Sequence, residues 1–169
     1  MRILGLDSSG IVASVAVVED DVLVAEYTIN YKKTHSRTLL PMLDEIVKMT
    51  ELDLESIDAI AVAAGPGSFT GLRIGSATAK GLGLALKKPL VAIPTVEGLA
   101  YNLYDTPGLI CPIMDARRKQ VYTGIYRFTD HRTGNSRRTD GCASGRNDQK
   151  VECIWTTCDL SGRWSTGIL

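Results

Sequence analysis

The chain has 169 residues, and 19 lysines and arginines balance 19 aspartates and glutamates, so its formal net charge is zero. This length fits one domain, or two small lobes, with a sizeable core. A neutral chain in which 44% of the residues are hydrophobic is an ordinary globular protein, and it is not one that grips nucleic acid through a dominant basic surface.

Three apolar segments open the chain and predict strands over residues 3–7, 12–18 and 22–30. Short polar turns separate them, so we expect an antiparallel meander. Asp7 interrupts the first apolar run too early for a signal peptide, and the longest uncharged stretch, residues 59–72, contains Gly65-Pro66-Gly67 and is too short to span a bilayer. We therefore expect a cytoplasmic protein with no membrane contact.

From residue 38 the apolar period becomes helical and predicts a helix that reaches residue 49. Its apolar residues cover half of the helical wheel, an arc wider than contact with one sheet needs: Leu39, Leu40, Met42, Leu43, Ile46, Val47 and Met49. Two interpretations are equally supported. The helix is either deeply buried, or it has a sheet on one side and a partner on the other.

The next segments alternate between strand and helix patterns. We predict strands over 59–64 and 90–93, helices over 70–86 and 95–104, and a final pair of strands over 109–114 and 120–128 with a turn at 116–119. The two strands 59–64 and 90–93 are almost wholly apolar, which is typical of strands covered on both faces. The order βββαβαβα followed by a hairpin predicts a mixed sheet flanked by helices, an α/β fold.

Small residues recur every four positions in the predicted helix 70–86, at Gly71, Gly75, Ala79 and Gly83. They lie along one face, although each glycine in a helix costs about 0.8–1 kcal/mol relative to alanine. Such a ridge lets another backbone approach closely. It indicates either packing within the chain or, with slightly more support, a subunit interface.

A glycine-rich loop at residues 65–71 joins a predicted strand to this helix, where phosphate-binding loops are found. It is not a Walker A loop, because Leu72-Arg73 replaces the Lys-Ser/Thr ending, and Thr70 occupies the third glycine position of the dinucleotide fingerprint. The loop is either an anion site or a plain turn at a sharp corner. Candidate nucleotide or anion residues are Asp7, Ser8, Ser9, Gly65, Gly67, Ser68 and Asp115.

Catalytic and metal-binding signals are scarce. Asp7 and Asp115 both end predicted strands and could hold a hydrated magnesium ion between them, or each could accept hydrogen bonds from its own turn. The spacing of Cys142, Cys153 and Cys158 with His131 matches no paired-ligand pattern, so we expect no metal site. The basic turn Arg117-Arg118-Lys119 is interpreted as a solvated hairpin tip, with a phosphate or RNA contact as the alternative.

Four motifs in order carry a family resemblance over residues 1–128. They are Leu6-Asp7-Ser8-Ser9, His35-Ser36-Arg37-Thr38-Leu39-Leu40-Pro41, Gly65-Pro66-Gly67-Ser68-Phe69-Thr70-Gly71-Leu72-Arg73-Ile74-Gly75 and Asp115-Ala116-Arg117-Arg118. This set resembles the TsaB (YeaZ) family, which is similar to the actin/Hsp70/hexokinase-like (ASKHA) fold, whose sheet begins βββαβα. The resemblance implies a role in making threonylcarbamoyladenosine beside the anticodon of tRNAs that read codons starting with A.

The resemblance also implies that TsaB is the non-catalytic partner of its relative TsaD, that the ATPase TsaE joins them, and that tRNA is met only through this complex. TsaD has a His-x-Glu-Gly-His segment whose histidines bind a metal, and the glycoprotease label of the family derives from that site. Here Thr95 and Leu99 stand at the two ligand positions, so we expect a pseudoenzyme without a cofactor of its own; ATP would enter through TsaE.

The resemblance and the helix patterns together predict pairing with TsaD, or with a second copy when the chain is alone, through Leu39, Leu43, Ile46, Gly71, Gly75, Ala79 and Gly83. Two other functions stay open: an ATP-binding and ATP-hydrolysing enzyme that uses Asp7 and the glycine-rich loop, and a homodimeric scaffold with another partner.

The composition changes after Phe128. Residues 1–129 contain 64 of the 75 hydrophobic residues, whereas residues 130–169 contain 11 together with three of the four cysteines and both tryptophans. We predict an ASKHA-like lobe over 1–108, the hairpin that starts a second lobe over 109–128, and an atypical, poorly ordered tail over 129–169. A frameshifted reading would explain that tail and an incomplete second lobe.

Overall fold

The computed structural model of the chain describes residues 1–31, 35–117, 120–128, 136–139, 154–158 and 164–168. The chain divides into two compact units, unit 1 from Met1 to Gly98 and unit 2 from Leu99 to Leu169. The predicted lobe boundary at residue 108 and the frameshift stay predictions.

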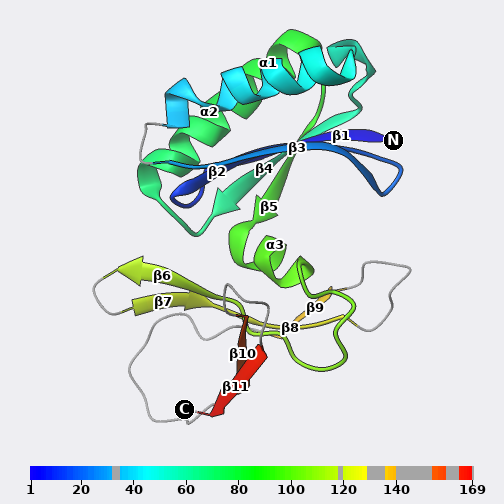
Figure 1. The fold of residues 1–169 in the computed structure, drawn as a ribbon. Coiled ribbons are helices and arrows are strands. Elements are labelled where there is room, and N and C mark those ends of the chain that lie inside the picture. Colours follow the sequence, from blue (N-terminus) through cyan, green and yellow to red (C-terminus); the bar gives the residue numbers. More distant parts are fainter. Residues whose placement is uncertain (32–34, 118–119, 129–135, 140–153, 159–163, 169) are drawn as a thin grey trace. The chain divides into compact units, whose positions relative to one another are not determined.

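A five-stranded mixed sheet forms the centre of unit 1, with the order β3-β2-β1-β4-β5 (Figure 1). Its strands are β1 (Arg2–Asp7), β2 (Val12–Glu19), β3 (Val22–Asn30), β4 (Ala59–Gly65) and β5 (Leu90–Pro94). The first three pair antiparallel, and β4 pairs parallel with both β1 and β5. The predicted meander followed by parallel strands is confirmed.

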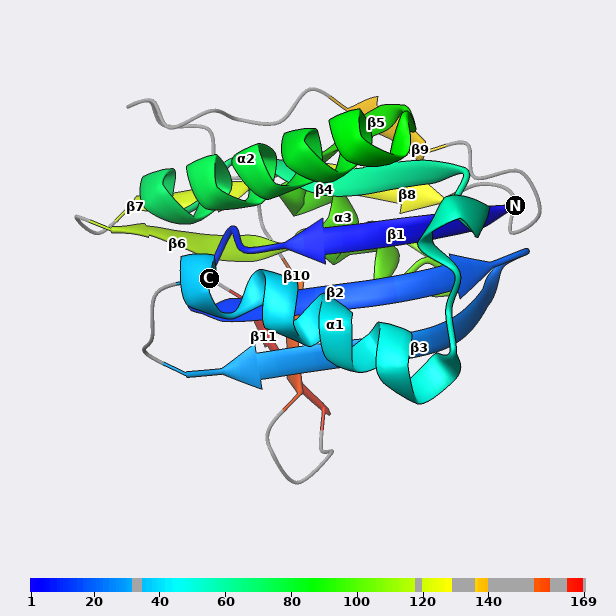
Figure 2. The same ribbon diagram turned by 90° about the horizontal axis from the view of Figure 1, so that it is seen from above.

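Two helices, α1 (Leu39–Thr50) and α2 (Phe69–Leu86), lie on the same face of this sheet and run side by side in the same direction (Figure 2). The short 3₁₀ turns η1 (His35–Arg37) and η2 (Leu54–Ser56) flank α1. The core lies between helices and sheet, and alternate residues of β1 and β2 supply it because side chains alternate across a strand. Its buried members are Leu4, Leu6, Ala13, Val15, Val17, Leu39, Met42, Leu43, Ile46, Ile57, Ile60 and Ala79.

The wide apolar arc of α1 is divided between core and surface. Met42 and Ile46 are buried among the core residues, whereas 51% of Leu40 and 82% of Met49 are exposed. The helix therefore has a sheet on one side and exposed apolar side chains on the other. The interpretation of α1 as a deeply buried helix is wrong.

Strand β5 differs from the prediction of burial on both faces. Leu90 and Val91 are 41% and 44% exposed. The physical reason is position: β5 is the last strand of the sheet, and α2, the helix nearest to it, lies mainly over β4 (Figure 2). An apolar run cannot by itself distinguish a central parallel strand from an edge strand.

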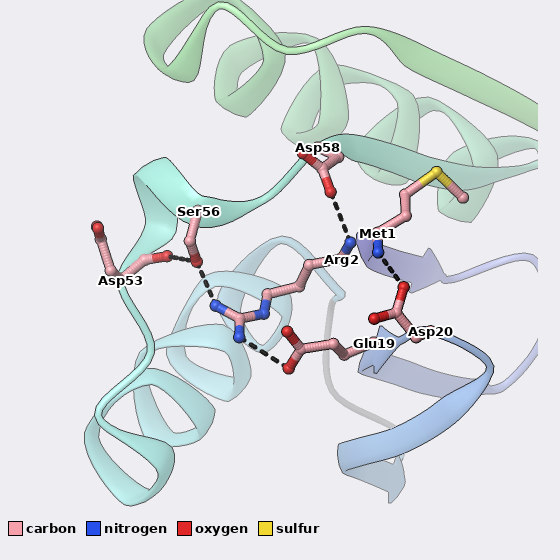
Figure 3. Close-up of polar contacts among 7 residues, drawn as sticks. All are labelled: Met1, Arg2, Glu19, Asp20, Asp53, Ser56 and Asp58. Atoms are coloured by element: carbon pink, nitrogen blue, oxygen red, sulfur yellow. Dashed lines mark hydrogen bonds and ion pairs between the residues drawn. The ribbon is translucent and has the colours of Figure 1, made fainter.

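A polar cluster fastens the amino end of β1 to its neighbours (Figure 3). The guanidinium of Arg2 donates to Ser56 Oγ over 2.5 Å and pairs with Glu19 Oε2 at 2.8 Å. The backbone N–H of Arg2 donates to Asp58 Oδ2 over 2.7 Å, and the amino group of Met1 forms an ion pair with Asp20. These contacts join β1 to the β2–β3 turn and to the segment that leads into β4.

Helix α3 (Thr95–Tyr101) is shorter than predicted. After it, the amides of Asn102, Leu103 and Tyr104 donate to carbonyls three residues back, those of Leu99, Ala100 and Tyr101. The expected end at residue 104 is wrong because the last turn tightens into a 3₁₀-type geometry.

Unit 2 contains short antiparallel pairs. Strand β6 (Ile113–Arg117) pairs with β7 (Gln120–Thr123), β8 (Ile125–Phe128) with β9 (Ser136–Thr139), and β10 (Ile154–Cys158) with β11 (Trp164–Ile168). The predicted strand 120–128 is interrupted at Gly124, where an added Cβ would lie 2.8 Å from the ring of Tyr126. The predicted strand 109–114 begins later, and only Ile110 of its first half pairs, as an isolated bridge to Tyr126.

Strands β9, β10 and β11 lie in the stretch that was predicted to be an atypical tail. They were not predicted, because that stretch lacks a sustained strand period. Arg118 and Lys119 of the basic turn lie outside the described residues, as do His131, Cys142 and Cys153.

Candidate functional site

The residues that were predicted to form a subunit interface lie inside unit 1. Leu39, Leu43, Ile46 and Ala79 are at most 4% exposed, and Gly71, Gly75 and Gly83 are also buried. These seven residues therefore face the protomer's own core and offer no surface to a partner. The choice of residues was wrong, although pairing itself stays a proposal.

The small-residue ridge of α2 instead lets this helix approach the end of β1. A Cβ on Gly71 would overlap the carbonyl oxygen of Ser8, and a Cβ on Gly75 would lie 2.5 Å from Ser8 Oγ. Ser8 is itself buried, and its hydroxyl donates to the carbonyl of Gly71 over 2.9 Å. Packing within the chain, the alternative interpretation of the ridge, explains these glycines.

Gly83, at the end of the ridge, also lies too close to its neighbours for a side chain. A Cβ on Gly83 would lie 2.8 Å from a methyl group of Leu90 and 3.2 Å from the carbonyl oxygen of Lys88. Helix α2 then ends at Lys87, which has a left-handed backbone with φ 55° and whose N–H donates to the carbonyl of Gly83. Close contact with β5 therefore accounts for this glycine as well.

A second set of small residues lies on the outward side of α2. Ala77, Gly81 and Ala85 are also four residues apart, and all three are exposed. A Cβ on Gly81 would meet nothing within 4 Å, so no contact with the described residues requires a glycine there. Sequence reasoning missed this set because a period of four occurs in α2 at two phases, and only the buried one was noticed.

Exposed apolar side chains accompany this second set. Leu84 is 84% exposed on α2, and Leu40 and Met49 are exposed near the two ends of α1. We call these six residues the outward surface: Leu40, Met49, Ala77, Gly81, Leu84 and Ala85. Exposed small and apolar residues on two neighbouring helices are suited to contact with another protein.

Charged residues of α1 border the outward surface. Lys48 Nζ lies 2.5 Å from Asp44 Oδ2 and 3.7 Å from Glu45 Oε1. The hydrogen bond to Asp44, followed by the charges of Asp44 and Glu45, raises the pKa of Lys48 above its usual value of 10.5. Lys48 is therefore charged at every physiological pH.

The candidate anion loop uses two of its amides for protein contacts. The N–H of Ser68 donates to the carbonyl of Ser9 over 2.7 Å, and the N–H of Gly71 donates to Ser68 Oγ over 3.3 Å. A Cβ on Gly67 would lie 2.5 Å from the same Ser9 carbonyl. The structure thus brings Ser8, Ser9, Gly67 and Ser68 together, and their contacts join β1 to α2. Binding of an anion there stays a prediction.

Asp7 and Asp115 each accept a hydrogen bond from a backbone two residues ahead. Asp7 Oδ1 accepts from the N–H of Ser9, and Asp115 Oδ1 accepts from the N–H of Arg117, both over 2.7 Å. This local arrangement is the turn-forming alternative that was weighed against magnesium binding. Asp7 belongs to unit 1 and Asp115 to unit 2, and a magnesium ion between them stays a prediction.

The segment that the family resemblance matches to the metal-binding motif of TsaD lies in α3. Thr95 is 5% exposed and Leu99 is 39% exposed, and a leucine side chain has no atom that ligates a metal. Among the residues that the structure describes, no three His, Cys, Asp or Glu side chains are grouped so that they could hold a metal ion.

No helix among the described residues is long and apolar enough to cross a membrane.

The family model for TsaD, tRNA N6-adenosine threonylcarbamoyltransferase, matches residues 22–140.

Two curated proteins named tRNA threonylcarbamoyladenosine biosynthesis protein TsaB are similar to the chain. The one from Bacillus subtilis is 41% identical over 128 residues, which are 76% of this chain and 56% of that protein. The one from Escherichia coli is 30% identical over 169 residues, which are 98% of this chain and 70% of that protein. The matched part of the chain thus spans between 56% and 70% of the length of these two relatives.

A solved structure, YeaZ from Pseudomonas aeruginosa, has the same fold. It superposes with a TM-score of 0.74 at 30% sequence identity, over 83% of this chain and 65% of that one. The α/β fold that the element order predicted, and the ASKHA-like fold that the family resemblance implied, are therefore confirmed.

Proposed function

The chain belongs to the TsaB family, and we propose that it is a non-catalytic subunit in the formation of threonylcarbamoyladenosine on tRNA. In this proposal it pairs with TsaD, TsaE joins the pair, and tRNA is bound through the complex. The reaction it supports would take place in the cytoplasm, next to the anticodon of tRNAs that read codons starting with A.

The proposed pairing with TsaD rests on one observation: Gly81 lies on the exposed face of α2 in open space. A glycine in a helix interior costs about 0.8–1 kcal/mol relative to alanine, and no contact that the structure describes offsets that cost. Close approach of a partner's backbone would use the space. The exposed side chains of Leu84 and Met49 would supply apolar area to the same contact.

The non-catalytic role rests on α3. Transfer of the threonylcarbamoyl group by TsaD depends, in the family resemblance, on a histidine pair that holds a metal. Thr95 and Leu99 occupy those two positions here, and a Leu side chain cannot replace an imidazole ligand. The catalytic residues would therefore belong to the partner.

Reconstitution of the modification tests this function directly. Purified TsaD, TsaE, tRNA, ATP and threonylcarbamoyl-adenylate are mixed with and without the full chain, and modified adenosine is measured by mass spectrometry of digested tRNA. We expect modification only when the chain is present together with TsaD, and none from the chain without TsaD.

Two other outcomes would overturn the proposal. ATP hydrolysis by the isolated chain that disappears in Asp7→Ala would identify an enzyme of the actin and hexokinase type. Formation of a stable homodimer that neither binds TsaD nor affects modification would identify a scaffold for another partner.

A further inference from the structure

A groove of about 650 Å³ lies along α2 on the side that faces β4 and β5. Its lining is mostly apolar and includes Val62, Leu72, Leu90 and Ala92. Helix α1 packs over β2 and β3, at the other side of α2. The groove shares Ala77 with the outward surface, but its other lining residues lie outside that surface, so a ligand in it goes beyond the proposed pairing.

Two cations, Arg73 and Lys80, are the charged residues that line the groove. Neither forms an ion pair within the described part of the chain. The guanidinium of Arg73 lies over the ring of Phe69, 5.3 Å from its centroid. A seven-residue separation on a helix places the two backbone positions about 10 Å apart and nearly in line. The groove thus offers two positive charges above an apolar floor.

The edge of the sheet forms the lower side of this groove. Strand β5 has one neighbour, β4, among the described strands. Leu90 and Ala92 alternate on the face of the strand that lines the groove. An edge strand has unpaired backbone groups that can pair with an added extended segment.

We propose that this groove binds an extended acidic segment of another protein as a strand beside β5. Carboxylates at alternate-face positions i and i+4 are about 13 Å apart in a strand, a span that the flexible side chains of Arg73 and Lys80 can meet. An apolar residue between them, at i+2, lies against Leu90 and Ala92. An apolar floor with only two cations suits such a peptide better than a nucleic acid backbone, which carries a charge at every nucleotide.

Fluorescence anisotropy with a labelled peptide tests the proposal on the full chain. The probe Ser-Glu-Thr-Val-Thr-Glu-Thr has its two glutamates and its valine on one face when it is extended. We expect saturable binding that weakens as salt is added, because the contacts are partly ionic. A shuffled peptide with adjacent glutamates, Ser-Val-Thr-Glu-Glu-Thr-Thr, should bind at least about tenfold more weakly.

Charge reversal locates the site. The double variant Arg73→Glu/Lys80→Glu should lose at least about tenfold in affinity, because attraction becomes repulsion. The neutral double variant Arg73→Gln/Lys80→Gln should also weaken binding. It tests the same site if the charge-reversed variant fails to fold. Arg37→Glu, a single charge reversal on η1 to be compared with Arg73→Glu alone, should leave affinity unchanged. Circular dichroism verifies that each variant is folded.

The proposal is overturned if the two peptides bind equally, or if Arg37→Glu weakens binding as much as the groove variants do. It is also overturned if no peptide binding saturates while a labelled single-stranded RNA binds and is released by Arg73→Glu/Lys80→Glu. That last result would make the groove a contact for nucleic acid.

Discussion

The hydroxyl of Ser8 donates a hydrogen bond to the carbonyl of Gly71 over 2.9 Å, and this contact fixes α2 against the end of β1. Ser8 follows β1 directly, and Gly71 lies in the first turn of α2. Gly71 has no room for a side chain because its backbone touches that of Ser8, and at Gly75 the hydroxyl of Ser8 occupies the space. This relationship separates glycines that serve the fold from the one glycine, Gly81, that α2 leaves in open space.

Gly71→Ala should destabilise the protein. Its Cβ would overlap the carbonyl oxygen of Ser8, which belongs to the backbone and cannot rotate away. Forcing one extra carbon into such a site costs about 1–3 kcal/mol. Thermal unfolding followed by circular dichroism measures the effect, and an unchanged melting temperature would show that the helix and β1 do not approach so closely.

Gly75→Ala should also destabilise the protein, but Ser8→Ala should partly rescue it. The added Cβ would lie 2.5 Å from Ser8 Oγ and 3.9 Å from Ser8 Cβ, so removal of the hydroxyl relieves the clash. A double-mutant cycle in denaturant measures the coupling, which we expect to be about 0.5–3 kcal/mol in favour of the double variant. Simple additivity of the two single effects would contradict the packing described for α2.

The ion pair between Met1 and Asp20 predicts a pH dependence of stability. The hydrogen bond to Asp20, aided by its charge, raises the pKa of the Met1 amino group above 8.0. Because the folded-state pKa is the higher one, the pair stabilises the protein below about pH 8 and loses this effect as the pH rises through the folded-state pKa. The melting temperature should therefore fall more steeply above pH 8 in the parent protein than in Asp20→Asn.

Asparagine is a suitable replacement in that comparison because Asp20 has a left-handed backbone, with φ 47°, which asparagine also adopts. Parallel curves for the parent and Asp20→Asn across this range would show that the ion pair does not contribute in solution.

Much of unit 1 could be predicted from the sequence because its local patterns agree with its packing. Alternation along residues 22–30 predicted β3 with both of its ends. The helical period that begins after Thr38 predicted α1, and its surplus of apolar residues predicted either deep burial or a second apolar contact, without indicating that Leu40 and Met49 are the exposed side chains. Each of these features depends on residues that are close together in the sequence, so the pattern that predicts it can be recognised in a single sequence.

Features that depend on how distant segments pack together were harder to predict from the sequence. The spacing of Gly71 and Gly75 indicated a smooth face, but the direction of that face depends on where β1 ends. A better clue was present: Ile74 and Leu82 flank these glycines on the helical wheel, and both pack against the core. In the same way, the apolar run of β5 does not indicate that the strand lies at an edge, because its edge position depends on the order of all five strands in the sheet.

The measurement that tests the central claim most directly is co-purification of TsaD with Gly81→Arg. An arginine at this position has open space within the chain, so the variant should fold with an unchanged melting temperature, yet its bulk and charge should block the outward surface. Glu55→Arg places an arginine at an exposed position of η2, outside the outward surface, as the control. We predict that Glu55→Arg retains TsaD and that Gly81→Arg loses it. Retention of TsaD by folded Gly81→Arg at the level of the parent protein would contradict the account.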